Sequence, residues 1–189
     1  MRTYLSFLFL FCGLQITIAQ PLQHVVPEQA HPTPRIYTEH YYKRFIQFMD
    51  EAPISNKDIV MLGNSLTENG GNWAARLGNK HVRNRGIIGD EVMGVYDRLH
   101  QILPGHPAKL FLLIGVNDIS HGLTSDSIVS MIRTTVERIR KESPDTRLYL
   151  QSLLPINESF GRYKRLTGKT SMIPEINKQI GGASCRERV

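Results

Sequence analysis

Short apolar runs alternate along the chain with longer stretches in which apolar residues recur every three or four positions. Four runs predict β-strands, at 58–62, 81–85, 109–115 and 146–152. Helical spacing predicts five helices, at 38–51, 65–77, 91–103, 125–142 and 174–180. Strands that alternate with helices in this way predict an α/β fold, a parallel sheet with helices on both faces.

Two of these segments have the clearest patterns. The run at 109–115 is the strongest predicted strand, and its apolar residues are typical of a strand buried on both faces. The helix predicted over 125–142 carries an apolar stripe at helical spacing: Ile128, Val129, Ile132, Val136 and Ile139. We expect Ser125 or Asp126 to cap its first turn. The helix predicted over 38–51 has a comparable stripe: Tyr41, Tyr42, Phe45, Ile46 and Met49.

The N-terminus has the pattern of a secretory signal peptide. Arg2 precedes an apolar stretch, and Thr17 to Ala19 places small residues before a cleavage point. We therefore expect residues 1–19 to be removed and the protein to be secreted or periplasmic, with no stable membrane anchor afterwards; a buried N-terminal helix is the alternative. Residues 20–35 contain four prolines and predict an extended lead-in.

Composition narrows the function classes. The chain of 189 residues is 41% hydrophobic and 21% charged, which is typical of a globular domain. Its net charge of +6 falls to +5 when Arg2 is lost, and its basic residues are scattered among acidic ones, so we expect no nucleic-acid partner. Loss of Cys12 with the signal peptide would leave Cys185 alone, which excludes an internal disulfide in the mature chain.

The loop after the first predicted strand reads Gly63-Asn-Ser-Leu-Thr-Glu68. Its serine, Ser65, lies between a strand end and a helix start, where backbone N–H groups and the helix dipole favour a developing negative charge. The alternative is structural, because Ser65 with Glu68 three residues later has the spacing of a capping box.

The next two strand ends add candidate hydrogen-bond donors. Residues 84–90 include Gly86 and Gly89, which permit a tight turn and a close approach of the backbone to an oxyanion. After the third strand, Asn117 could donate from its side-chain amide to a tetrahedral intermediate. A plain strand-to-helix turn capped by Asp90 and an Asx turn are the respective alternatives. Ligands bind at the carboxyl ends of strands in open α/β sheets, so the three loops together predict a site.

These three loops, in this order, resemble the blocks of the SGNH (GDSL-like) hydrolase family. The similarity runs from about residue 37 to 180 and is closest to secreted bacterial carbohydrate O-acetylesterases and the platelet-activating-factor acetylhydrolase-like branch. It implies a flavodoxin-like three-layer α/β/α fold and ester hydrolysis without a metal or cofactor. It also implies that Ser65 is the nucleophile and that Ser65 N–H, Gly89 N–H and the Asn117 amide form the oxyanion hole. Asn64 departs from the family's aspartate, and we expect its amide to hold the turn equally.

A fourth family block, Asp-x-x-His, should supply the base after a fifth strand, and we find no equivalent. Asp97 and His100 have the spacing but fall inside a predicted helix, and Asp118 and His121 fall in a surface loop. Residues 181–189 have no apolar period and look foreign. We therefore expect a hydrolase domain at 36–180 that holds four of five strands, ends C-terminally incomplete, and is weak or inactive as an enzyme.

The resemblance predicts a serine esterase that hydrolyses acyl esters, with acetyl esters of carbohydrate as the expected substrate. The expected partner is thus a small-molecule or glycan ester. A non-catalytic carbohydrate- or lipid-binding relative is the alternative from another class, and a phospholipid or lysophospholipid acylhydrolase is the alternative among enzymes. The basic segment 160–169 either favours an acidic sugar or is a solvated loop.

Overall fold

The computed structural model describes residues 37–161 and 163–184. The predicted signal peptide, the lead-in at 20–35 and residues 185–189 lie outside the described residues. Residues 181–184 continue the last helix, α7 (Met172–Ser184), which is longer at both ends than the helix predicted over 174–180.

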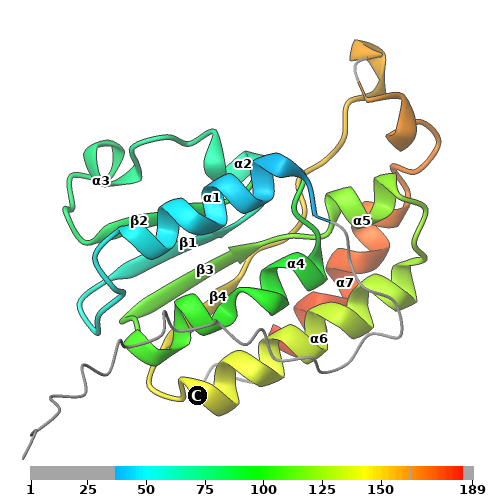
Figure 1. The fold of residues 1–189 in the computed structure, drawn as a ribbon. Helices are drawn as coiled ribbons and strands as arrows, with labels where there is room; N and C mark the ends of the chain where they lie inside the picture. Colours follow the sequence, from blue (N-terminus) through cyan, green and yellow to red (C-terminus); the bar gives the residue numbers. More distant parts are fainter. Residues whose placement is uncertain (1–36, 162, 185–189) are drawn as a thin grey trace, which may run out of the picture. The chain divides into compact units, whose positions relative to one another are not determined.

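Four parallel strands form one sheet in the order β2-β1-β3-β4 (Figure 1). They are β1 (Ile59–Gly63), β2 (Val82–Gly86), β3 (Lys109–Leu113) and β4 (Arg147–Leu150). Each lies within a residue or two of a predicted strand, and the parallel α/β architecture is confirmed. Gly63 pairs with both Gly86 and Leu113, so the first three strands end at the same level of the sheet. The loops that follow them therefore begin side by side.

One face of the sheet packs against helices α4 (Val92–Asp97), α6 (Ser125–Glu142) and α7. Alternate strand residues supply the sheet side of this core: Val60, Leu62, Leu110 and Leu112, all without exposed surface. The predicted stripe of α6 supplies the other side and is buried in full. Each such aliphatic side chain contributes about 1.5–3 kcal/mol relative to leaving it in water, so this layer holds most of the core.

The opposite face carries half-buried side chains. Phe111 and Tyr149 are neighbours in register, and their rings stack with centroids 4.5 Å apart. Asn84 of β2 faces the same way as Phe111, since both are paired with Met61. Its amide donates to the carbonyl groups of Glu68 and Gly71, which brings the segment between β1 and β2 alongside the sheet edge.

The helix predicted over 65–77 is in fact two short helices, α2 (Ser65–Glu68) and α3 (Trp73–Arg76). Gly71 separates them with a φ of +63°, a conformation that glycine adopts without strain and that no helix continues. The Trp73 indole then folds back and donates to the Thr67 carbonyl at 2.8 Å. The apolar pattern was compatible with one helix, but the two glycines interrupt it.

The prediction over 91–103 was also too long. Helix α4 ends at Asp97, and two 3₁₀ turns follow it, at Leu99–Gln101 and Leu103–Gly105. Pro104 lies in the second turn and has no N–H for an α-helical bond. A further short helix, α5 (Val116–Ser120), occupies part of the loop expected after β3.

Helix α1 (Glu39–Asp50) lies where a helix was predicted, but its inward face differs from the predicted stripe. Tyr41 and Phe48 are buried, whereas Tyr42, Ile46 and Met49 are 50%, 58% and 40% exposed. The segment has two overlapping apolar stripes one residue apart, one with Tyr41 and Phe48 and the other with Tyr42 and Met49. The first faces inward, because the Tyr41 hydroxyl donates to the Gly94 carbonyl of α4 at 3.1 Å.

Helix α6 (Ser125–Glu142) spans the predicted range, but its N-cap lies one residue before the expected one. Thr124 is the N-cap, and its hydroxyl accepts from the Ser127 N–H. Ser125 and Asp126 are therefore not caps. Ser125 points inward and donates to Glu175 of α7 at 2.7 Å, so this serine joins two helices.

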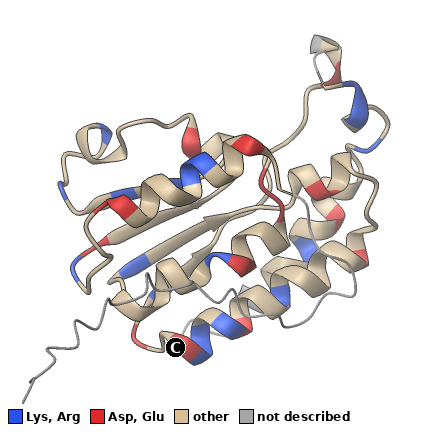
Figure 2. Cartoon of the chain, in the orientation of Figure 1, with Lys and Arg blue, Asp and Glu red and all other residues tan. Residues whose placement is uncertain are grey.

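Lys and Arg are interspersed with Asp and Glu over the described chain (Figure 2). On α6, Arg138 pairs with Glu142 one turn away and lies over the Tyr96 ring. Searching the described residues for a helix with the length and apolarity to span a bilayer finds none.

Substituting Gly86 tests how closely β2 packs beneath α2. A Cβ on Gly86 would lie 2.1 Å from the Glu68 backbone nitrogen, so we expect Gly86→Ala to lower the free energy of unfolding by about 1–3 kcal/mol. Gly181→Ala is the matched control, because its Cβ meets no atom within 4 Å. Chemical denaturation of both variants checks this, and equal stabilities would contradict it.

Candidate active site

Ser65 is the first residue of α2 and lies two residues after the end of β1. Asn64 is the N-cap of this helix, and its side-chain oxygen accepts from the Leu66 N–H at 3.0 Å. The capping-box hypothesis for Ser65 is therefore wrong. The expectation that the Asn64 amide can hold the turn is confirmed. Since α2 has four residues, the helix dipole adds little, and local N–H groups must supply any stabilisation of charge.

Glu68 connects this helix to the second loop. Its carboxylate accepts from the Ile88 N–H at 2.6 Å and also meets His40 and Arg44 of α1. Ile88 directly precedes Gly89, so Glu68 fixes the backbone next to the second predicted donor.

Gly89 and Asn117 occupy the other two strand-end loops. Gly89 is exposed and has a φ of +82°, where a side chain would be strained. Asn117 lies in the first turn of α5, and its amide donates to the Asp90 carbonyl at 2.8 Å. This acceptor belongs to the residue directly after Gly89, so the fold brings these two predicted site residues together.

The predicted nucleophile and donors have free hydrogen-bonding groups. Among the described residues, the hydroxyl and the N–H of Ser65 and the N–H of Gly89 make no hydrogen bond. The Asn117 amide uses one of its two hydrogens on Asp90. N–H groups that point to no protein acceptor at a strand-end serine are what an oxyanion hole requires.

An ion pair lies within the same loops. Asp90 and Arg98 have no exposed side-chain surface, and the guanidinium donates to the carboxylate at 2.8–2.9 Å. Burial raises the pKa of the Asp90 carboxyl to about 6, while the positive charge of Arg98 opposes that rise.

None of the described histidines makes a hydrogen bond to Ser65. His40, His81 and His121 pair through space with the carboxylates of Glu68, Asp58 and Glu91 respectively. These partners are 20 to 30 residues away along the chain, so spacing in the sequence did not reveal them. Two others bond elsewhere, His100 to the Asp97 carbonyl and His106 to the Ser143 hydroxyl.

The two Asp-x-x-His sequences are not catalytic pairs in the structure. The Asp118 carboxylate is buried and accepts from the Val92 N–H. His121 is exposed and takes Glu91 as its partner instead. The Asp97 carboxylate accepts from the Tyr37 hydroxyl rather than from His100. The two carboxylates are therefore engaged elsewhere, and His100 meets only the backbone carbonyl of its aspartate.

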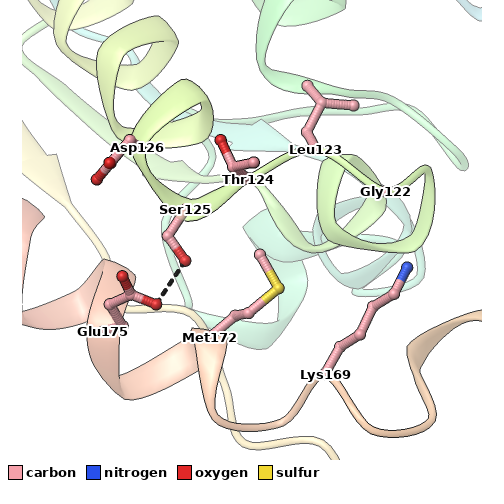
Figure 3. A pocket seen from close by; sticks show the side chains of 8 residues that line it. All are labelled: Gly122, Leu123, Thr124, Ser125, Asp126, Lys169, Met172 and Glu175. Carbon is pink, nitrogen blue, oxygen red and sulfur yellow. Dashed lines mark hydrogen bonds between the residues drawn. The ribbon is translucent and has the colours of Figure 1, made fainter.

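Two open pockets lie to either side of this region. One of about 410 Å³ lies where α7 meets the start of α6, and Lys169, Met172 and Glu175 line one side of it (Figure 3). The other pocket, of about 560 Å³, is polar and lies beside β2. Its lining residues include Arg44 and Arg83. Ser65, Gly89 and Asn117 line neither, so the predicted site is a surface arrangement of loops.

Comparison with known proteins identifies the family. Residues 61–185 match the GDSL-like lipase/acylhydrolase family, and this span includes all three strand-end loops. The chain belongs to that family.

This acylhydrolase-family chain is also similar in sequence to an individual mammalian protein. Platelet-activating factor acetylhydrolase IB subunit alpha1 of Bos taurus is 24% identical over 112 residues, which are 58% of this chain and 48% of that protein. The chain thus spans about half the length of that relative.

Two solved structures share the architecture. A GDSL-like lipase from Bacteroides thetaiotaomicron has a TM-score of 0.66 at 19% identity, over 79% of this chain and 75% of that chain. A member of the lipolytic protein G-D-S-L family from Veillonella parvula has a TM-score of 0.54 at 16% identity, over 70% of this chain and 75% of that chain.

The raised pKa of Asp90 predicts a pH dependence of stability. Between pH 3.8 and about 6 the folded state holds a proton on Asp90 that the unfolded state has lost. The stabilisation from this group is complete below pH 3.8 and is lost as the pH rises through about 6. We expect the free energy of unfolding, relative to Asp90→Asn, to fall by about 2.4 kcal/mol between pH 4 and 7, at about 1.4 kcal/mol per pKa unit. Urea denaturation of both proteins across this range is the measurement, and a constant or rising difference would contradict it.

Proposed function

We propose that this chain carries the nucleophile and oxyanion hole of a serine esterase that cleaves acyl esters. The observation that carries the proposal is the meeting of three strand-end loops with Ser65, Gly89 and Asn117 on them. Family membership supports the reaction class, and the unbonded hydroxyl and N–H groups support the roles of the three residues.

The chemistry follows from these groups. The Ser65 oxygen attacks the ester carbonyl carbon, and its proton passes to a base. The carbonyl oxygen becomes negative and accepts from Ser65 N–H, Gly89 N–H and the Asn117 amide. When this intermediate collapses, the bond to the alcohol breaks, the alcohol takes a proton, and the acyl group stays on Ser65 until water releases it.

The base of this reaction is not among the described contacts of Ser65. A serine hydroxyl is a weak nucleophile without an adjacent base, although the oxyanion hole alone still gives some acceleration. We therefore propose that the chain as given turns over slowly by itself.

We further propose that the leaving alcohol is a carbohydrate and the acyl group is acetyl. The name of the bovine relative, an acetylhydrolase, supports a short acyl group. The basic segment after β4 projects beyond the carboxyl end of the sheet (Figure 1), with Lys164 and Arg165 exposed. Lys169 instead donates to the Ile119 carbonyl at 2.9 Å, so it has a structural role whether or not the segment meets an acidic sugar.

A non-catalytic carbohydrate- or lipid-binding protein is the second candidate. The separation of every described histidine from Ser65 favours it, since a binding protein needs no base. In that case Ser65 would contribute no acyl transfer under any condition. A phospholipid or lysophospholipid acylhydrolase would use the same reaction on a different alcohol and a longer acyl chain.

Chemical rescue separates these candidates. We expect purified residues 20–189 to hydrolyse p-nitrophenyl acetate slowly, and added imidazole to accelerate the reaction in a saturable way by supplying the missing base. Ser65→Ala should show only the unsaturable reaction of imidazole in solution. Release of p-nitrophenol, followed against imidazole concentration, is the measurement.

Two further variants complete this test. Ser130→Ala, an exposed serine of α6, should behave as the unchanged protein. His121→Ala should also leave the rate unchanged, because His121 pairs with Glu91. Identical rates for Ser65→Ala and the unchanged protein at every imidazole concentration would favour the binding protein. Fast turnover without imidazole that His121→Ala abolishes would make His121 the base.

A further inference from the structure

The ion pair of Asp90 and Arg98 joins the first two catalytic loops. Besides its bonds to Asp90, Arg98 donates to the Gly63 carbonyl at 3.1 Å. Gly63 ends β1, two residues before Ser65, and its carbonyl also accepts from the Ile87 N–H at 3.0 Å. One guanidinium thus contacts the strand that carries the nucleophile and the loop that carries Gly89.

Asp90 extends the connection to the third loop. Its backbone carbonyl accepts from the Asn117 amide at 2.8 Å, and its own N–H donates to Ile87. Its side chain accepts from the Glu91 N–H. Asp90 therefore fixes the peptide next to Gly89 and the direction of the Asn117 amide together.

Helix α4 is shaped to admit this carboxylate. A Cβ on Gly94 would lie 1.9 Å from Asp90 Oδ1, so only glycine at this position leaves the space. The Gly94 carbonyl is in turn held by the Tyr41 hydroxyl.

A contribution to the free energy of folding is a poor explanation for the buried ion pair of Asp90 and Arg98. Removing two charges from water costs several kcal/mol each, and apolar residues of similar size are often as stable in their place. Within the described residues, Nη1 of Arg98 is buried without any hydrogen-bond partner, which adds to that cost. The geometry that the pair imposes is a better reason for its presence.

We propose that Arg98 is a positioning residue of the oxyanion hole, acting through Gly63 and Asp90. This inference rests on the proposed function, in which Ser65 N–H, Gly89 N–H and the Asn117 amide receive the oxyanion. Arg98 itself touches no reacting atom. Its hydrogen bonds fix the distance between the loop of Ser65 and the loop of Gly89. Because the Asp90 carbonyl accepts from the Asn117 amide, the same bonds also fix the position of that amide.

Arg98→Gln and Arg98→Lys test the proposal, with Arg85→Gln as the matched control. Arg85 is also buried, pairs with Glu51 at 2.6 Å and lies over the same Phe48 ring, 4.6 Å from its centroid. It makes no hydrogen bond to Gly63, Asp90 or Asn117. The two substitutions remove the same charge from comparable depth, so they separate positioning from general stability.

The first readout is the imidazole-rescued, Ser65-dependent hydrolysis of p-nitrophenyl acetate. We expect Arg98→Gln to lower kcat about 10- to 100-fold with KM nearly unchanged, because the oxyanion exists only in the transition state. Arg98→Lys should recover part of this loss, since it keeps the charge but not the forked donors. Arg85→Gln should lower Tm but leave kcat within about twofold.

The second readout needs no turnover. In ¹H–¹⁵N spectra of the unliganded protein, Arg98→Gln should shift the Gly89 backbone amide and the Asn117 side-chain amide, and Arg85→Gln should not. Unchanged resonances in Arg98→Gln, or an equal loss of kcat in both glutamine variants, would overturn the proposal. If Arg98→Gln does not fold, Arg98→Lys decides by the same spectra. If no Ser65-dependent turnover exists, the proposed function fails, while the amide shifts still test the positioning.

Discussion

The carboxyl ends of β1 and β2 meet where there is no room for side chains, and the arrangement of the site follows from this contact. A Cβ on Gly63 would lie 2.3 Å from the Leu113 carbonyl, and one on Gly86 would lie 2.1 Å from the Glu68 nitrogen. Because neither residue has a side chain, α2 can pass directly over the end of β2. Parallel pairing in register then starts all three loops at one level. A larger residue at Gly86 would push α2, and Ser65 with it, away from the end of β2, and one at Gly63 would push β1 away from the Leu113 carbonyl of β3.

Three arginine side chains lie around the Phe48 ring, next to these loops. Arg44 and Arg85 lie 4.6 Å from the Phe48 ring centroid, and Arg98 lies 5.9 Å from it. Arg98 and Arg44 also donate to the carbonyl groups of Gly63 and Gly86, the last residues of β1 and β2, whereas Arg85 donates to a carbonyl within β2. Helix α1, which precedes the sheet in sequence, therefore contributes the aromatic ring of Phe48, which makes cation–π contacts with the three arginines. A hydrophobic contact could fill the same volume but could not direct hydrogen bonds to chosen carbonyls.

Much of the fold was predictable because its patterns are local. Strand positions followed from apolar runs, and the stripe of α6 matched its buried residues since one face alone was apolar. The inward face of α1 was not predictable, because its two stripes are equally apolar and only the partner, Gly94, distinguishes them. The break between α2 and α3 was visible as two glycines, yet a pattern of apolar spacing cannot say that Gly71 takes a positive φ.

The sequence by itself determined the family, the order of the three loops and the residue types in them, because each motif is contiguous along the chain. Only the tertiary structure decided which groups are paired. Asp90 looked like a helix cap and is the partner of a buried arginine, and Glu68 looked like half of a capping box and instead holds the Ile88 N–H. His121 likewise forms its ion pair with Glu91, although Asp118 has the spacing of the family motif. Such pairings join residues 8 to 30 positions apart in these bonds, and they depend on distances that exist only once the strands have paired and the helices have packed.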